Sequence, residues 1–204
     1  MGDENEILLQ QVADHLIIQS SGLSDLGLYH GKMGIVLFFA HYARYTKNQV
    51  YDDFADELMD EIYADIHAGL FLDLENGLAG IGWGILYLLK NGFTEGDPGV
   101  VLKDLDQRMQ EINLLRVKEQ SLARGLTGYI QYLTERIAIG NHPFDTAYLA
   151  DYHAVQSRAS FPMPLFQLSD LIDRHPATCL EEVPKESLGL QKGYAGYGLK
   201  QILR

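Results

Sequence analysis

The tetrapeptide Gly31-Lys32-Met33-Gly34 opens onto the apolar run Ile35-Val36-Leu37-Phe38-Phe39-Ala40, and the chain repeats this arrangement three more times. The other copies are Gly77-Leu78-Ala79-Gly80, Gly125-Leu126-Thr127-Gly128 and Gly193-Tyr194-Ala195-Gly196. From first glycine to first glycine the spacings are 46, 48 and 68 residues (77−31, 125−77, 193−125). A fixed motif that returns at such a period is typical of a repeat architecture. The sequence therefore predicts one helical unit used four times.

Two kinds of helix alternate along the chain. Each motif opens a helix that is apolar on nearly every side, which is typical of a buried helix. Amphipathic patterns come between them, at 5–19, 50–67 and 98–115, and shorter helices are expected at about 145–157 and 165–172. Since all-apolar helices need neighbours on most sides, they belong inside the amphipathic ones. We predict an all-α fold of about four helical hairpins in two layers, as a single domain over residues 1–204.

The paired glycines have two expected uses. A sharp turn into a helix often needs a positive φ, which glycine adopts at little cost, and a missing side chain permits close approach. On a structural interpretation the glycines do no more than make tight helix corners. On a functional interpretation four helix N-termini gather at one end, where free N–H groups form a floor that binds anions.

Composition limits the partners. The 204 residues carry a net charge of −12, which repels nucleic acid and anionic membranes. The same charge either attracts a cationic peptide or serves solubility alone. The single cysteine, Cys179, excludes an intrachain disulfide and favours a reducing compartment. The acidic first residues do not resemble a signal peptide, and the run 35–40 is too short to span a membrane. We expect a cytoplasmic protein without nucleic-acid or membrane partners.

The four motifs and the helices that follow them resemble the lanthionine synthetase C (lantibiotic cyclase) family over residues 5–204. The matching text is His30-Gly31-Lys32-Met33-Gly34-Ile35, Gly77-Leu78-Ala79-Gly80-Ile81-Gly82-Trp83-Gly84, Ser121-Leu122-Ala123-Arg124-Gly125-Leu126-Thr127-Gly128 and Gly193-Tyr194-Ala195-Gly196-Tyr197-Gly198. The resemblance implies an α/α toroid, here a partial one. It also implies peptide modification, in which family cyclases add a cysteine thiol to a dehydrated serine or threonine. Their zinc is held by two cysteines and a histidine, and a histidine serves as acid/base.

This sequence departs from the family pattern at the zinc ligands. Tyr29-His30-Gly31 has tyrosine where the family has cysteine, and Cys179 lies away from every motif. One thiolate cannot complete a two-sulfur, one-nitrogen set, so no metal and no cofactor are predicted. The resemblance leaves His30 as the catalytic candidate. It equally fits a role in capping the turn by a hydrogen bond.

Aromatic residues and one arginine near the motifs are the candidate binding residues. Tyr29 is one of them, and Arg124 either recognises a carboxylate or forms a surface ion pair. The others either line a central pocket or belong to the core. They are Trp83, Tyr129, Tyr194 and Tyr197. The six remaining histidines show no metal-ligand spacing with another ligand.

Two functions remain open. The first is a lantibiotic-cyclase-like protein that binds a peptide substrate or partner protein without zinc chemistry, and is non-catalytic. The second is a toroid enzyme of the six-hairpin glycosidase kind, which acts on a carbohydrate with carboxylates. Since four hairpins would leave apolar flanks open, where the family has about seven, we also expect a homo-oligomer or association with another protein.

Overall fold

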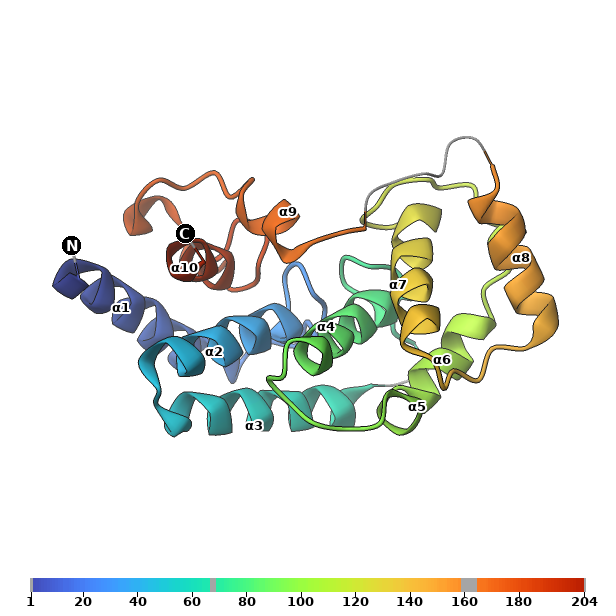
Figure 1. The fold of residues 1–204 in the computed structure, drawn as a ribbon. Helices are drawn as coiled ribbons and strands as arrows, with labels where there is room; N and C mark the ends of the chain where they lie inside the picture. Colours follow the sequence, from blue (N-terminus) through green and yellow to red (C-terminus); the bar gives the residue numbers. More distant parts are fainter. Residues whose placement is uncertain (1, 67–68, 159–164, 204) are drawn as a thin grey trace. The chain divides into compact units, whose positions relative to one another are not determined.

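The computed structural model describes residues 2–66, 69–158 and 165–203. Every regular element in these ranges is helical, with ten α-helices and two short 3-10 helices (Figure 1). The prediction of an all-α fold is confirmed. The contacts divide the chain into two compact units, Met1–Gly69 with Gln167–Arg204 (unit 1) and Leu70–Phe166 (unit 2). The toroid and the single domain stay predictions. Among the described helices, none combines the length and apolar character needed to cross a bilayer.

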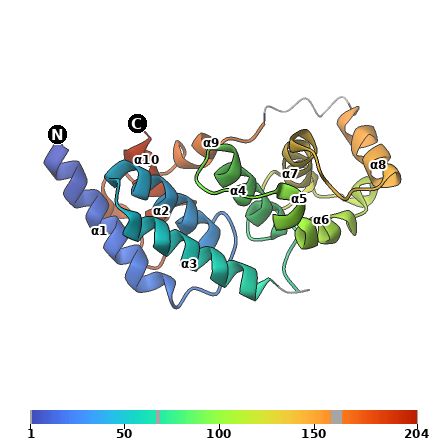
Figure 2. The same ribbon diagram turned by 60° about the horizontal axis from the view of Figure 1, so that its bottom comes forward.

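Unit 1 is built around one central helix. Its elements are α1 (Gly2–Ser20), α2 (Lys32–Thr46), α3 (Gln49–Asp65), α9 (Leu168–Ile172), η2 (Leu180–Glu182) and α10 (Tyr194–Ile202). Helix α2 is buried without interruption over residues 32–40, as its all-apolar sequence predicts, because α1, α3 and α10 all contact it (Figure 2). The helix of the fourth motif thus packs on the helix of the first.

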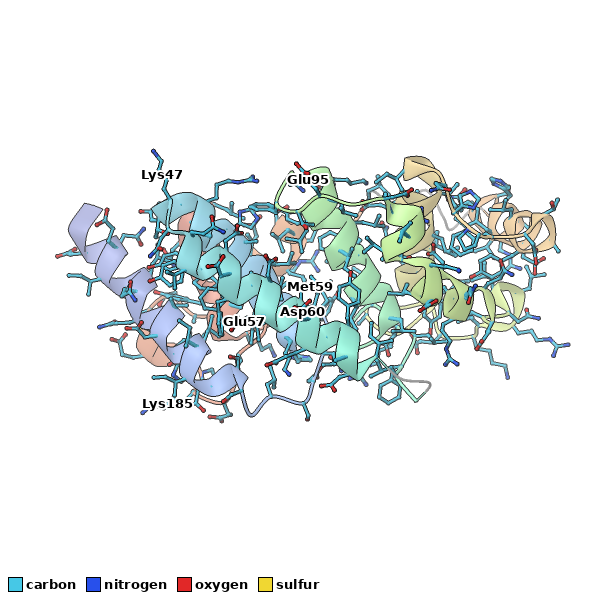
Figure 3. The ribbon with its side chains drawn as sticks, turned by 90° about the horizontal axis from the view of Figure 1, so that it is seen from below. Lys47, Glu57, Met59, Asp60, Glu95 and Lys185 are labelled. Carbon is cyan, nitrogen blue, oxygen red and sulfur yellow. The ribbon has the colours of Figure 1, made fainter. Side chains whose placement is uncertain are left out.

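Helix α3 has one solvent-exposed face and one buried face. Its buried residues recur at helical spacing, at Tyr51, Ala55, Leu58 and Ile62. Glu57 and Asp60 are exposed, and both project from the helix (Figure 3). Asn48 ends the preceding turn, and its Oδ1 accepts a hydrogen bond from the Val50 N–H (3.1 Å). The amphipathic helix predicted at 50–67 is confirmed as far as Asp65.

Unit 2 holds the second and third motifs. Its elements are α4 (Leu78–Lys90), α5 (Pro98–Val101), α6 (Lys103–Gln110), η1 (Leu114–Arg116), α7 (Leu126–Ile139) and α8 (Thr146–Gln156). Helices α4 and α7, each opened by a motif, contact one another. Helix α4 is buried without interruption over residues 78–86, as expected for a helix with neighbours on most sides.

The long helix predicted over 98–115 is wrong. Leu102 adopts ψ 6° and separates α5 from α6, and α6 ends at Gln110. A tyrosine that is distant in sequence helps to terminate α6, because the Tyr148 hydroxyl donates a hydrogen bond to the Met109 carbonyl near the end of that helix (2.8 Å). Of the apolar residues that predict the buried face, Leu102, Leu105 and Met109 are buried, and Val101 and Ile112 are half-buried. Periodicity thus identified the buried face but not the break.

Candidate functional site

Each motif is preceded by a six-residue loop that lies across the start of the helix. We call these hook loops 1 to 4, at residues 25–30, 71–76, 119–124 and 187–192. In every copy the N–H after the first glycine donates to the carbonyl of the first hook-loop residue. The bonds are Lys32 to Asp25 (2.9 Å), Leu78 to Phe71 (2.9 Å), Leu126 to Glu119 (2.8 Å) and Tyr194 to Ser187 (2.9 Å). The repeat therefore extends six residues before the glycine.

The hook loop explains the first glycine of each motif. The expected positive φ is wrong, because the four glycines have φ between −105° and −118°, in extended backbone. A Cβ on any of them would instead lie under 3 Å from the carbonyl oxygen six residues earlier. Those carbonyls are the ones of Asp25, Phe71, Glu119 and Ser187. Close approach of backbone, the second expected use, is thus the physical reason for glycine.

The anion-binding interpretation loses its basis in the backbone. In all four copies the first helical N–H already has a carbonyl partner. In three copies the second N–H has one as well, at 3.0–3.3 Å, from Met33 to Leu26, Ala79 to Leu72 and Ala195 to Leu188. A helix start binds anions through N–H groups that have no other acceptor. These helix starts are capped by the chain itself.

Within each unit two hook loops are joined by the same bond. In unit 1 the Gln191 N–H donates to the Tyr29 carbonyl (2.8 Å). In unit 2 the Glu75 N–H donates to the Ala123 carbonyl (2.9 Å). All four residues stand two positions before their motif's first glycine. Each unit thus presents a pair of hook loops in register, and the candidate residues Tyr29, His30 and Arg124 lie in these pairs.

Arg124 is held by a carboxylate from the neighbouring loop. Its Nε and Nη2 donate to the Oε2 and Oε1 of Glu75, at 2.5 and 3.2 Å. The Arg124 side chain is 66 % exposed, whereas that of Glu75 is 10 % exposed. A buried carboxylate therefore orients an exposed guanidinium, which fits the expected ion pair and also leaves Arg124 accessible.

Tyr129, in the first turn of α7, is half-buried. Burial, and then the charge of Asp73, raises the pKa of its phenol, so it stays protonated at neutral pH. Burial also raises the pKa of Asp73, against a hydrogen bond from the Asn76 backbone. Two acidic groups, an arginine and a phenol thus belong to the paired loops of unit 2 and the helix start beside them.

In unit 1, His30 is half-buried and makes an edge contact with the ring of the buried Tyr29. The neighbouring loop approaches it closely, because a Cβ on Gly189 would lie under 3 Å from the His30 backbone. His30 thus sits at the junction of hook loops 1 and 4.

The remaining aromatic candidates lie in the core. Trp83 is 2 % exposed, and its Nε1 donates to the Glu135 Oε1 (3.0 Å). Tyr194 stacks on His15 with ring centroids 3.9 Å apart. Tyr197 is 3 % exposed and packs against the His175 ring. Of the two expectations for these three rings, the burial fits core packing. A binding role for them stays a prediction.

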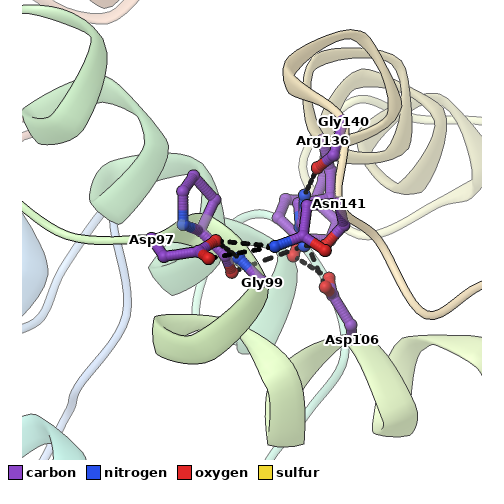
Figure 4. Close-up of polar contacts among 8 residues, drawn as sticks. Asp97, Gly99, Asp106, Arg136, Gly140 and Asn141 are labelled. Carbon is purple, nitrogen blue, oxygen red and sulfur yellow. Dashed lines mark hydrogen bonds and ion pairs between the residues drawn. The ribbon is translucent and has the colours of Figure 1, made fainter.

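Unit 2 contains a buried ion pair that the sequence pattern did not predict. Arg136 and Asp106 have no exposed side-chain surface, and Arg136 Nε donates to Asp106 Oδ2 at 2.8 Å (Figure 4). Its Nη1 and Nη2 donate to the carbonyls of Gly140 (2.6 Å) and Asn141 (2.9 Å), which follow the end of α7. Tyr132 donates to Asp106 Oδ1 (2.5 Å). Burial raises the pKa of Asp106, opposed by the donors Tyr132 and Arg136.

This buried cluster has a structural role, because Arg136 donates its hydrogen bonds to Asp106 and to the carbonyls of Pro98, Gly140 and Asn141, all within unit 2. The sequence pattern gave only a weak indication of this cluster. Tyr132 and Arg136 share a helix face at i and i+4, but Asp106 is 26 residues away from Tyr132.

The residues of this chain do not fit the zinc set that the resemblance implies. Among the described residues no three side chains of the types His, Cys, Asp and Glu gather as a metal site would require. Cys179 is exposed and precedes η2. Two thiolates cannot come from a chain with one cysteine.

The fold and the paired hook loops define an all-helical repeat protein whose motif glycines seat a preceding loop on each helix start. Over residues 22–157 the chain matches the family described as lanthionine synthetase C-like protein. It belongs to that family. Searches of curated proteins and of solved structures return no match. The family match gives no support to the carbohydrate-acting alternative.

Proposed function

We propose that this chain is a lanthionine-cyclase-like protein that binds a peptide during peptide modification, and that its residues supply contacts rather than a thiol-activating zinc centre. Family membership over residues 22–157, combined with a single cysteine in the chain, carries the proposal. A member without the two thiolates retains the fold's capacity to hold a peptide but has no family-type means of lowering a thiol's pKa.

The paired loops of unit 2 offer the best-supported contact. Glu75 engages Nε and Nη2 of Arg124, which leaves Nη1 to donate to a peptide oxygen. The pairing holds an exposed side chain in one orientation, so less conformational entropy is lost on binding. Tyr129, in the first turn of α7, supplies a half-buried ring and a protonated phenol. The net charge of −12 favours a basic peptide over an acidic one.

The test uses two labelled peptides that contain Ser, Thr and Cys and differ only in carrying Lys or Glu at the same positions. Fluorescence anisotropy with the full chain should show tighter binding of the Lys peptide. Arg124→Ala should weaken binding about tenfold, the loss expected for one charge-assisted hydrogen bond. Arg116→Ala removes an equal charge from an exposed position in the same unit and should change affinity less than twofold. Absence of binding, or equal effects of the two arginine variants, would refute the proposal.

Metal content tests the second part of the proposal, that the chain has no thiol-activating zinc centre. We expect purified protein to bind zinc below stoichiometric amounts. Stoichiometric zinc that is lost in Cys179→Ser would contradict the assignment.

We also propose that the chain self-associates and works in a reducing, cytoplasmic environment. Helix α1 exposes Ile7 (60 %) and Ile18 (69 %), and apolar side chains of this kind are often covered by a partner. The lone cysteine suits a reducing compartment. Light scattering at several concentrations should show an oligomer, and a mass of one chain throughout would exclude self-association.

A further inference from the structure

His175 is a buried histidine that follows helix α9. It is 4 % exposed, and none of the proposed peptide contacts uses it. Its ring lies at the start of α10, edge-on to Tyr197 with centroids 5.9 Å apart. A Cβ on Gly196 would clash first with the Leu190 carbonyl and would also come within 3.2 Å of His175 Cδ2, so the second glycine of the fourth motif admits both the hook loop and this ring.

Both ring nitrogens are engaged by backbone. Nδ1 accepts from the Ala177 N–H (3.3 Å), so Nδ1 carries no proton. Nε2 lies 3.0 Å from the Gly193 carbonyl oxygen, which can only accept, so Nε2 carries the proton. The two bonds are satisfied together by one form alone, the neutral ring protonated at Nε2. This ring ties residues 173–177 to the first glycine of the fourth motif.

A second proton must go to Nδ1, where it meets the Ala177 N–H. That bond then breaks, because two donors face each other. The neighbouring groups do not compensate. Lys200 on α10 donates its Nζ to the His175 carbonyl (2.9 Å) and adds positive charge, and Tyr197 is an uncharged phenol.

The acidic groups around this ring are engaged elsewhere or exposed. On η2, Glu182 accepts from the N–H and the hydroxyl of Thr178. Glu181 is exposed and is hydrogen-bonded by its own backbone and by Cys179. Asp170 on α9 accepts a hydrogen bond from the Gln167 N–H, and Asp173 is exposed. The neighbouring Arg174 is a cation and is exposed as well. Among the residues that the structure describes, none of these carboxylates forms a hydrogen bond with the His175 ring, whose nitrogens face the Gly193 carbonyl and the Ala177 N–H.

We propose that His175 is an acid-sensitive latch, whose neutral ring holds the α9–η2 segment against the start of α10 and whose protonation at Nδ1 releases it. Burial, and then Lys200, lowers the pKa of His175 against the opposing bond to Gly193. In the open form, in which the α9–η2 segment is released from α10, the His175 ring takes up a proton near pH 6.5, the ordinary value for histidine. The closed form resists that proton. The latch therefore holds above pH 6.5 and weakens as the pH falls through that value.

The tautomer is tested directly by ¹⁵N NMR of the histidine rings in the full chain at pH 7.5. We expect His175 to show a protonated Nε2 and an unprotonated Nδ1. It should begin to titrate only below pH 6.5. The reverse tautomer, or titration at or above 6.5, would overturn the proposal.

The release is tested by amide hydrogen exchange at pH 7.5 and 5.0, expressed as protection factors so that the intrinsic rate cancels. Amides of residues 173–192 should lose protection at pH 5.0 by up to about 30-fold, the limit set by an open-form pKa of 6.5. The comparison is made in a His41→Gln background, because burial also lowers the pKa of His41 on α2 and its protonation would weaken the whole of unit 1. In that background the amides of α3, in the same unit, should change far less.

Two variants distinguish release of the latch from a general loss of stability in acid. His175→Gln keeps a donor for Gly193, and His175→Asn keeps an acceptor for Ala177, but neither takes up a proton. Their protection over 173–192 should be lower at pH 7.5 and independent of pH between 7.5 and 5.0. His153→Gln, an exposed position on α8, should behave like wild type. An equal pH-dependent loss in the two His175 variants and wild type, or uniform loss across unit 1, would refute the latch.

Discussion

The buried pair Asp106–Arg136 should dominate the stability of unit 2. Arg136→Met removes the guanidinium while retaining much of the side-chain volume. Asp106 then keeps the hydrogen bond from the Tyr132 hydroxyl, whereas the carbonyls of Gly140 and Asn141 lose the hydrogen bonds that Arg136 donates to them. Removing one member of a buried ion pair costs about 3–5 kcal/mol, because the remaining charge has no partner and no water. That is a large share of the 5–15 kcal/mol by which domains are usually stable.

A substitution at the other member of the pair should cost less stability. Asp106→Asn is nearly isosteric, and Arg136 keeps two short hydrogen bonds to carbonyl oxygens. We expect about 2–3 kcal/mol. The double variant should fall short of the sum by at least about 1 kcal/mol, because each single change has already broken the same contact.

Urea unfolding at pH 7.5 measures these changes, and Trp83 provides the probe. It is the chain's one tryptophan and lies in unit 2, so its emission reports on that unit. Arg116→Met, at an exposed position, is the matched control and should stay within about 0.5 kcal/mol of wild type. A loss below about 1 kcal/mol for Arg136→Met, or strict additivity in the double variant, would refute the reasoning.

Three further predictions follow from the described contacts. Gly125→Ala should destabilise by about 1–3 kcal/mol in urea unfolding, because the new Cβ meets the hook-loop carbonyl, whereas Gly22→Ala, whose nearest neighbour is 4.0 Å away, should be near neutral. Burial, and then Arg44, lowers the pKa of His41 to about 4. Neutral His41 thus supports the fold above pH 6.5, and up to about 3 kcal/mol should disappear by pH 4, a slope that His41→Gln should remove. Asn48→Ala should cost about 0.5–2 kcal/mol by thermal or urea unfolding, and Asn48→Asp, which keeps the cap, much less. A thermal midpoint of Asn48→Ala equal to wild type would exclude the cap.

The hook loops show where a longer sequence pattern was available. A leucine stands three residues before the first glycine in every copy, at Leu28, Leu74, Leu122 and Leu190. Leu28, Leu74 and Leu190 are fully buried. The motif x-Leu-x-x-Gly-x-x-Gly would therefore have predicted a loop folded back on the helix start, which the tetrapeptide alone did not.

The amino-acid sequence by itself determined the helical class, the buried character of α2 and α4, the wet face of α3 and the family. These are local properties, since apolar spacing and a motif are read along one segment. The tertiary structure alone decided why the motif residues are glycine, which hook loops pair, that Asp106 and Arg136 are buried and that His175 is held neutral. Each of these depends on atoms far apart in sequence, and the cost of burying a charge or of adding a methyl group is set by what the fold places beside it.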